Sequence, residues 1–91
     1  MRDVILSEAA QQIMDYYFES YQGSYYNNDM QKRAFNYSKV IKHLAYIDLF
    51  LDDVYIKNHK EYIDIEDICT VEFSMKNPTE ILIKNIYFKN N

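Results

Sequence analysis

The sequence predicts an α+β fold in which a pair of helices covers one face of an antiparallel sheet. A short apolar segment at residues 3–6 opens the chain, two segments with helical periodicity follow, and residues 61–89 alternate as strands do. We therefore expect an N-terminal strand, an antiparallel helical hairpin and a three-stranded antiparallel meander. A sheet with one apolar face needs a cover, so the fold should have two layers.

The first helix is expected over residues 8–21. Ser7 offers a side-chain oxygen to the free N–H groups at its start, and Gly23, the only glycine, stands where a helix C-cap favours glycine. Apolar side chains recur at helical spacing along one predicted stripe, which consists of Ala9, Ile13, Tyr17 and Tyr21 with Ala10 and Met14 beside it.

The second helix is expected over residues 29–50. The loop before it is short, which favours an antiparallel pair of helices. The predicted apolar stripe contains Met30, Ala34, Tyr37, Ile41 and Leu44, widened by Phe35, Val40 and Ile47. The opposite, solvated stripe contains Lys32, Asn36, Lys39 and His43.

The second half of the chain predicts the sheet. Residues 51–60 read as a loop with a short extended piece at 54–56, and a strand is expected over 62–65. Residues 69–75 alternate most clearly and place Cys69 on the buried face with Val71, Phe73 and Met75. Residues 76–79 carry the turn signal. The last strand, residues 80–89, changes phase, which a β-bulge near Lys84 and Asn85 would reconcile.

Length and composition favour one ordinary globular domain over residues 1–91. No apolar run is long enough to span a membrane, and the N-terminus lacks the pattern of a signal peptide. The single cysteine cannot form an internal disulfide, which favours a cytoplasmic location. The two histidines and the scattered acids lack the spacing of metal ligands, so we expect neither a metal nor a cofactor.

Charge is unevenly distributed along this chain of net charge −4, which disfavours a general nucleic-acid binder. Four basic residues, Lys32, Arg33, Lys39 and Lys42, fall in a segment without acids on the second helix. We predict that they contact an acidic partner or phosphate. A solvated helix face is the alternative.

Tyrosines cluster at the end of the first helix and in the loop that follows, at positions 16, 17, 21, 25 and 26. Tyrosine joins apolar area to a polar tip and is favoured at protein interfaces. One helix cannot bury all five against a single sheet. We therefore predict that partner binding involves Tyr16, Tyr21, Tyr25 and Tyr26.

Few side chains suit acid–base chemistry. His43 falls on the polar stripe of the second helix, where it reads as a solvated residue, and His59 falls in the loop before the sheet. Tyr87 on the closing strand has Lys84 and Lys89 nearby in sequence, and could supply part of an RNA-cleaving set. The catalytic candidates are His59, Tyr87, Lys84 and Lys89, against the alternative of ordinary surface residues.

The order of elements and several short motifs resemble the RelE/ParE superfamily of bacterial toxin–antitoxin toxins. Residues 4–10 are similar to the family's opening strand and its Leu-Ser-x-x-Ala helix start. Residues 13–17 resemble the family's first helix, residues 69–75 its central strand, and residues 80–88 its closing strand. The resemblance covers nearly the whole chain.

This resemblance implies the toxin of a type II toxin–antitoxin, or plasmid stabilisation, system. It implies a small antitoxin that lays a helix or extended segment across the sheet and the first helix. It also implies a bacterial target such as DNA gyrase or the ribosome, and it is compatible with a homodimer.

The chain departs from the mRNA-cleaving members of the family. Phe88 falls at the position of their closing histidine and Asn90 near that of their closing arginine, while Tyr62 or Ile63 replaces a basic residue. We therefore expect a toxin that acts by binding a target such as gyrase. The alternatives are a ribosome-dependent mRNA endonuclease and a diverged, non-toxic interaction module.

Overall fold

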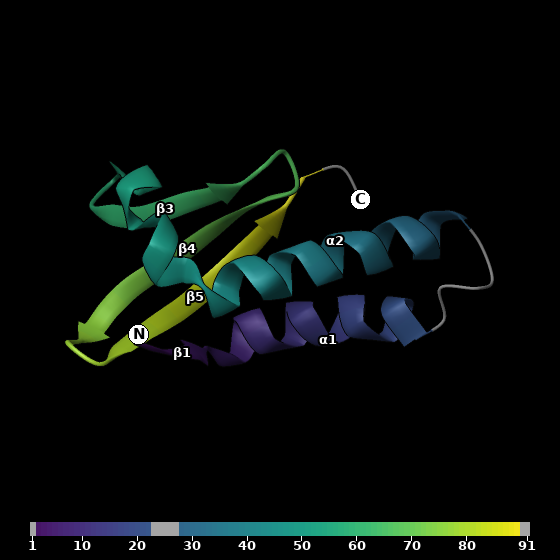
Figure 1. The fold of residues 1–91 in the computed structure, drawn as a ribbon, viewed down its shortest axis with the longest axis horizontal. Coiled ribbons are helices and arrows are strands. Elements are labelled where there is room, and N and C mark those ends of the chain that lie inside the picture. The colour runs from purple at the N-terminus through teal and green to yellow at the C-terminus, as the bar shows by residue number, and fades with distance from the viewer. Residues whose placement is uncertain (1, 23–27, 90–91) are drawn as a thin grey trace.

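The computed structural model describes residues 2–22 and 28–89, which form two helices and a five-stranded sheet (Figure 1). The elements in chain order are β1 (Asp3–Leu6), α1 (Glu8–Gln22), α2 (Asn28–Ala45), the 3₁₀ helix η1 (Ile47–Asp53), β2 (Tyr55–Lys57), β3 (Lys60–Ile65), β4 (Cys69–Asn77) and β5 (Glu80–Phe88). The expected α+β class, with its N-terminal strand, two helices and antiparallel meander, is confirmed. The predicted cap at Gly23 lies outside the described residues.

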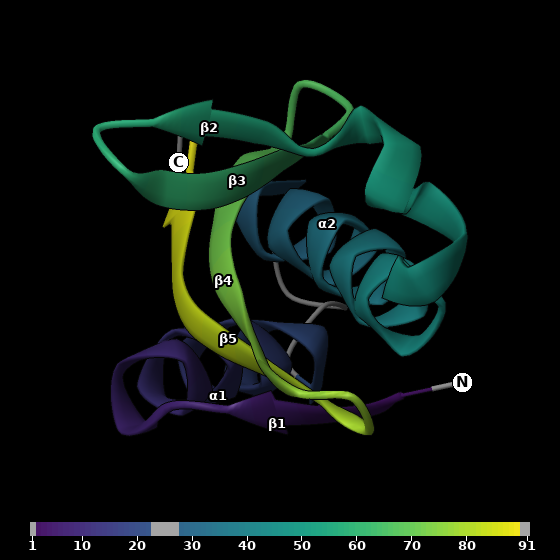
Figure 2. The same cartoon turned by 90° about the vertical axis from the view of Figure 1, so that its left-hand side faces the viewer.

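The sheet has the order β1-β5-β4-β3-β2 (Figure 2). Strands β2 to β5 form the antiparallel meander, and β1 pairs in parallel with β5. A parallel pair needs a long crossover connection. Here α1, α2 and the first strands of the meander provide it, so the N-terminal strand lies beside the last one.

The meander contains one strand more than expected, because the extended piece predicted at 54–56 pairs as β2 with β3. The two strands are joined by a two-residue turn at Asn58 and His59, whose φ angles are 53° and 64°. Positive φ at both positions is what a type I′ hairpin requires. The sequence lacks the glycine that usually marks such a turn.

Helix α2 ends at Ala45, earlier than the predicted boundary at 50, and the chain continues as η1. The change from α-helix to 3₁₀ helix accompanies two interactions of η1. Ile47 is buried in the core, and Asp48 accepts hydrogen bonds of 2.6 Å from the backbone N and from Nη1 of Arg2, next to β1. The backbone hydrogen bond from Arg2 is the main cause of the lowered pKa of Asp48.

One hydrophobic cluster joins both helices to one face of the sheet. On α1 the buried residues are Ala10, Met14 and Tyr17, whereas Ala9, which the predicted stripe included, is exposed. The buried face of α1 is therefore rotated slightly about the helix axis from the predicted stripe. On α2 the prediction was too wide, because Phe35 and Ile41 remain 59% and 40% exposed.

Strands β4 and β5 form the centre of the core. The predicted bulge is confirmed: the register shifts between Glu72, opposite Asn85, and Phe73, opposite Ile83. The extra residue returns Ile86 to the buried face. Cys69 is fully buried, as expected, and its burial raises the thiol pKa to about 12. Met75 is 38% exposed, contrary to expectation, because it lies near the outer end of β4.

Ser7 fixes α1 to this bulge. Its side-chain oxygen accepts a hydrogen bond of 3.1 Å from the Ala10 N–H, which confirms the predicted N-cap. The same hydroxyl donates a 2.6 Å hydrogen bond to the carbonyl of Lys84, and the Ser7 N–H bonds the carbonyl of Ile83. A single residue therefore sets where α1 starts relative to β5.

Candidate functional site

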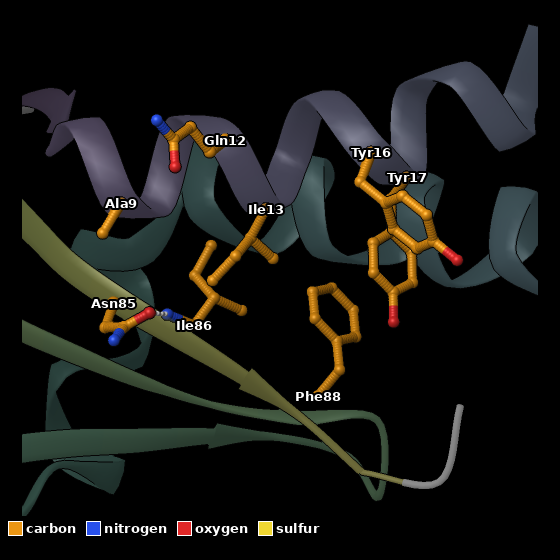
Figure 3. A pocket seen from close by; sticks show the side chains of 8 residues that line it. All are labelled: Ala9, Gln12, Ile13, Tyr16, Tyr17, Asn85, Ile86 and Phe88. Carbon is orange, nitrogen blue, oxygen red and sulfur yellow. Dashed lines mark hydrogen bonds between the residues drawn. The ribbon is translucent and has the colours of Figure 1, made fainter.

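An open groove lies between α1 and the second half of β5 (Figure 3). Its volume is about 500 Å³. Ile13 from the helix and Ile86 and Phe88 from the strand give it apolar walls, and exposed Ala9 leaves one end open. We term this feature the α1–β5 groove. It exists because Ser7 holds the start of α1 on the bulge while the helix crosses β5.

Two amide side chains line the same groove. Asn85 Oδ1 accepts a 2.9 Å hydrogen bond from the N–H of Ile86, which holds its side chain in place. Gln12 is exposed and makes no hydrogen bond within the described part of the chain through its side chain. An amide both donates and accepts, so Gln12 can bond the backbone of an extended segment.

Aromatic rings close the far end of the groove. Tyr17 stacks on Phe88 with ring centroids 4.0 Å apart, and burial raises the pKa of its phenol. Tyr16 is 50% exposed and packs edge-on against Tyr17, while the Arg33 guanidinium lies 5.3 Å from the Tyr16 ring. The predicted partner residues Tyr16 and Arg33 are therefore adjacent, although they come from different helices.

The other predicted partner residues divide into two groups. The side chains of Tyr21, Tyr25 and Tyr26 lie outside the described residues. Lys39 forms a 2.8 Å ion pair with Glu66 and lies 4.8 Å from the Phe35 ring. Lys32 and Lys42 are exposed on α2 and line different hollows, Lys42 together with Lys39.

The catalytic candidates do not converge. The sheet register places Asp64, Thr70 and Tyr87 in one row across β3, β4 and β5. His59 lies beyond the opposite end of β3, at the tip of the β2–β3 hairpin, roughly 16 Å away along the strand. Lys84 lies in the bulge. Lys89 follows the end of β5 and lines a small hollow together with Lys32.

Tyr87 is engaged with a residue that sequence reasoning missed. Its hydroxyl donates a 2.9 Å hydrogen bond to Glu72 Oε1, which is the main cause of the raised pKa of Tyr87. Glu72 is only 6% exposed although it faces away from the helices. Strict alternation marks Glu72 as a surface residue. Only the register, which sets Glu72 between Tyr62 and Asn85, reveals its burial.

A second hydrogen-bonded group occupies the same sheet face. Asp64 Oδ1 accepts hydrogen bonds from the Thr70 hydroxyl at 2.7 Å and from the Tyr55 hydroxyl at 3.0 Å. The bond from Thr70 is the main cause of the lowered pKa of Asp64. On this face the hydroxyls of Tyr55, Thr70 and Tyr87 therefore donate to carboxylates within the chain.

His43 differs from its prediction as a solvated residue. Its ring is half-buried and stacks on Phe50 with centroids 3.9 Å apart, because η1 folds back beside the end of α2. Burial lowers the pKa of His43, against the opposing effects of Glu66 and Asp53.

The described ranges, 2–22 and 28–89, contain neither a group of metal ligands nor a helix suited to cross a membrane. Within them no three His, Cys, Asp or Glu side chains gather closely enough to hold a metal ion. No helix in these ranges combines the length and the apolar character that crossing a membrane requires.

Comparisons give no relative for the chain. No protein-family model matches it, and searches of curated proteins and of solved structures found no match.

Proposed function

We propose that this chain acts by binding other proteins, as a RelE/ParE-like toxin that a small antitoxin neutralises. The α1–β5 groove is the observation that carries the proposal. An open groove of about 500 Å³ between a helix and a strand, lined by both apolar side chains and amides, suits a side chain or short segment of a partner polypeptide.

The groove also defines the chemistry of the segment that fits it. Ile13, Ile86 and Phe88 favour an apolar anchor, and the Gln12 amide favours exposed backbone beside that anchor. Arg33 is half-buried next to Tyr16 and forms no ion pair with a described residue. An acidic side chain following the anchor would complement it. We therefore propose an antitoxin segment with an apolar residue flanked by a carboxylate.

Binding is preferred over RNA cleavage because the candidate acid–base groups are scattered. General acid–base catalysis needs its groups within hydrogen-bond reach of the reacting atoms. His59 is far along the sheet from Tyr87, and the Tyr87 hydroxyl already donates to Glu72. A gyrase-type target, which requires no nuclease site in the toxin, is the form of the proposal that we favour.

Induced expression in a bacterial host, with and without the neighbouring reading frame, tests this function. We expect growth arrest and SOS induction from the chain alone and relief by the neighbouring product. Gln12→Arg should fill the groove and weaken binding of that product at least about tenfold. Gln11→Arg is the matched control, since Gln11 is also exposed on α1 but does not line the groove. Two results would contradict the proposal. One is that expression of the chain alone causes no growth arrest, and the other is that the neighbouring product relieves arrest by the Gln12→Arg variant as fully as arrest by the wild-type chain.

A further inference from the structure

A second hollow, of about 620 Å³, lies where η1 folds back beside the end of α2. We term it the α2–η1 hollow. It shares no residue with the α1–β5 groove, so what it binds is independent of the antitoxin proposal. Its walls come from residues 39–50, and Glu66 of the β3–β4 turn completes its rim.

Aromatic and aliphatic side chains form much of the wall of the hollow. His43 and Phe50 stack nearly parallel, with an interplanar angle of 19°, and both half-buried rings line the hollow. Tyr46 and Leu49 line the same hollow and are 50% and 71% exposed. An exposed aliphatic side chain beside stacked rings offers contact area to the apolar part of a ligand, such as a planar ring.

The rim of the hollow is cationic. Lys39 already binds a carboxylate there, since its Nζ lies 2.8 Å from Glu66 Oε1. Lys42 lines the same rim and forms no ion pair with any residue that the structure describes. The lining residues thus carry two positive charges against one negative charge, in a chain whose net charge is −4. This local excess favours an anionic ligand.

We propose that the α2–η1 hollow binds a small organic anion with a planar apolar body. The body lies against the His43–Phe50 wall and Leu49, and the anionic group pairs with Lys42. The volume falls within the range of about 300–1,000 Å³ that is usual for small-molecule sites. A compact ligand with one anionic group fits better than an acidic polypeptide, because Lys39 is already paired with Glu66 and Lys42 alone remains for a ligand.

Fluorescence titration with 8-anilinonaphthalene-1-sulfonate, an aromatic anion whose naphthalene ring is planar, tests the site on the folded full chain. We expect saturable binding at one site, weakened at least about fivefold by Lys42→Glu and by Leu49→Ala. Both side chains are exposed, so neither change disturbs the core. Lys57→Glu on β2 is the matched charge control and should change the affinity less than about twofold. N-phenyl-1-naphthylamine, which lacks the sulfonate, should bind without sensitivity to Lys42→Glu.

Displacement of the dye identifies the anionic group. Indole-3-acetate represents carboxylates and adenosine monophosphate represents phosphates, and displacement by either supports the proposal. Equal losses in Lys57→Glu and Lys42→Glu would overturn it, since the dye would then report only the overall charge. Displacement by poly-L-glutamate but by neither small anion would also overturn it, in favour of a polypeptide-binding surface.

Discussion

His59 illustrates how the backbone can decide the role of a residue. Its φ of 64°, next to 53° at Asn58, places both turn residues in the left-handed region. A non-glycine residue there loses about 1–2 kcal/mol relative to right-handed backbone, and asparagine tolerates the region better than histidine does. In the sequence, the imidazole makes His59 a candidate for acid–base chemistry. In the hairpin, however, its position requires only a residue that can adopt a positive φ.

His59→Gly is therefore expected to stabilise the protein. Glycine suits the second position of a type I′ turn, and the gain should be about 1 kcal/mol, or roughly 4–8 °C in melting temperature. Thermal unfolding followed by circular dichroism measures it. As a control, His59→Ala keeps the positive φ without relief and should not raise the melting temperature. A lower melting temperature for the glycine variant would show that the imidazole itself stabilises the hairpin.

His43 should make stability depend on pH. Burial lowers its folded-state pKa below the ordinary value of 6.5, so between these two pKa values the unfolded chain binds more protons than the folded one. The free energy of unfolding should therefore fall as the pH is lowered from about 7.5 to about 5.5. Denaturant unfolding across this range measures the slope.

His43→Phe provides the comparison, because it keeps a ring against Phe50 without a titrating group. We expect a flatter pH dependence than in the wild-type chain. The His59→Gly variant, which leaves His43 in place, should retain the wild-type slope. An unchanged slope in His43→Phe would assign the pH dependence to other groups.

At the scale of elements, Ser7 connects a helix cap to a strand bulge. Ser7→Ala removes the acceptor for the Ala10 N–H and leaves the Lys84 carbonyl without this donor. The expected loss is about 1–2 kcal/mol in the free energy of unfolding. Ser38→Ala, in the exposed part of α2, should change it by less than about 0.5 kcal/mol. Equal effects of the two changes would refute this role for Ser7.

Local sequence signals predicted the elements that depend on local physics. The cap at Ser7, the buried face of Cys69, Val71 and Phe73 and the phase change at Lys84 were predicted correctly, because each reflects contacts within a few residues. The end of α2 did not follow from such signals. It depends on burying Ile47 and on the distant contact between Asp48 and Arg2.

The two proposed binding sites were less predictable, because each combines residues from separate elements. Helical periodicity placed Tyr16 on a surface but could not set it beside Arg33 of the second helix. The α2–η1 hollow depends on the early end of α2, which the sequence signals placed too late. The sequence predicted only a short extended piece where β2 lies, because the turn that joins β2 to β3 lacks glycine.

At the scale of the whole molecule, the helices cover one face of the sheet, and three hydroxyls of the other face bond carboxylates of the same chain. Asp64 and Glu72 accept hydrogen bonds from Tyr55, Thr70 and Tyr87 across four strands. A tyrosine that must give up its proton gains nothing from a carboxylate partner that raises its pKa. This arrangement supports the proposal that the chain binds a partner and does not cleave RNA.

The most direct test of that claim is a search for ribosome-dependent mRNA cleavage in a translating bacterial extract. An mRNA-cleaving member of the RelE/ParE superfamily serves as the positive control. The loss of positioned acid–base groups removes about 10²–10⁴ in rate, so we expect no codon-specific cuts from the wild-type chain. Codon-specific cuts that disappear with Tyr87→Phe or His59→Ala would contradict the account and assign the chain to the endonucleases.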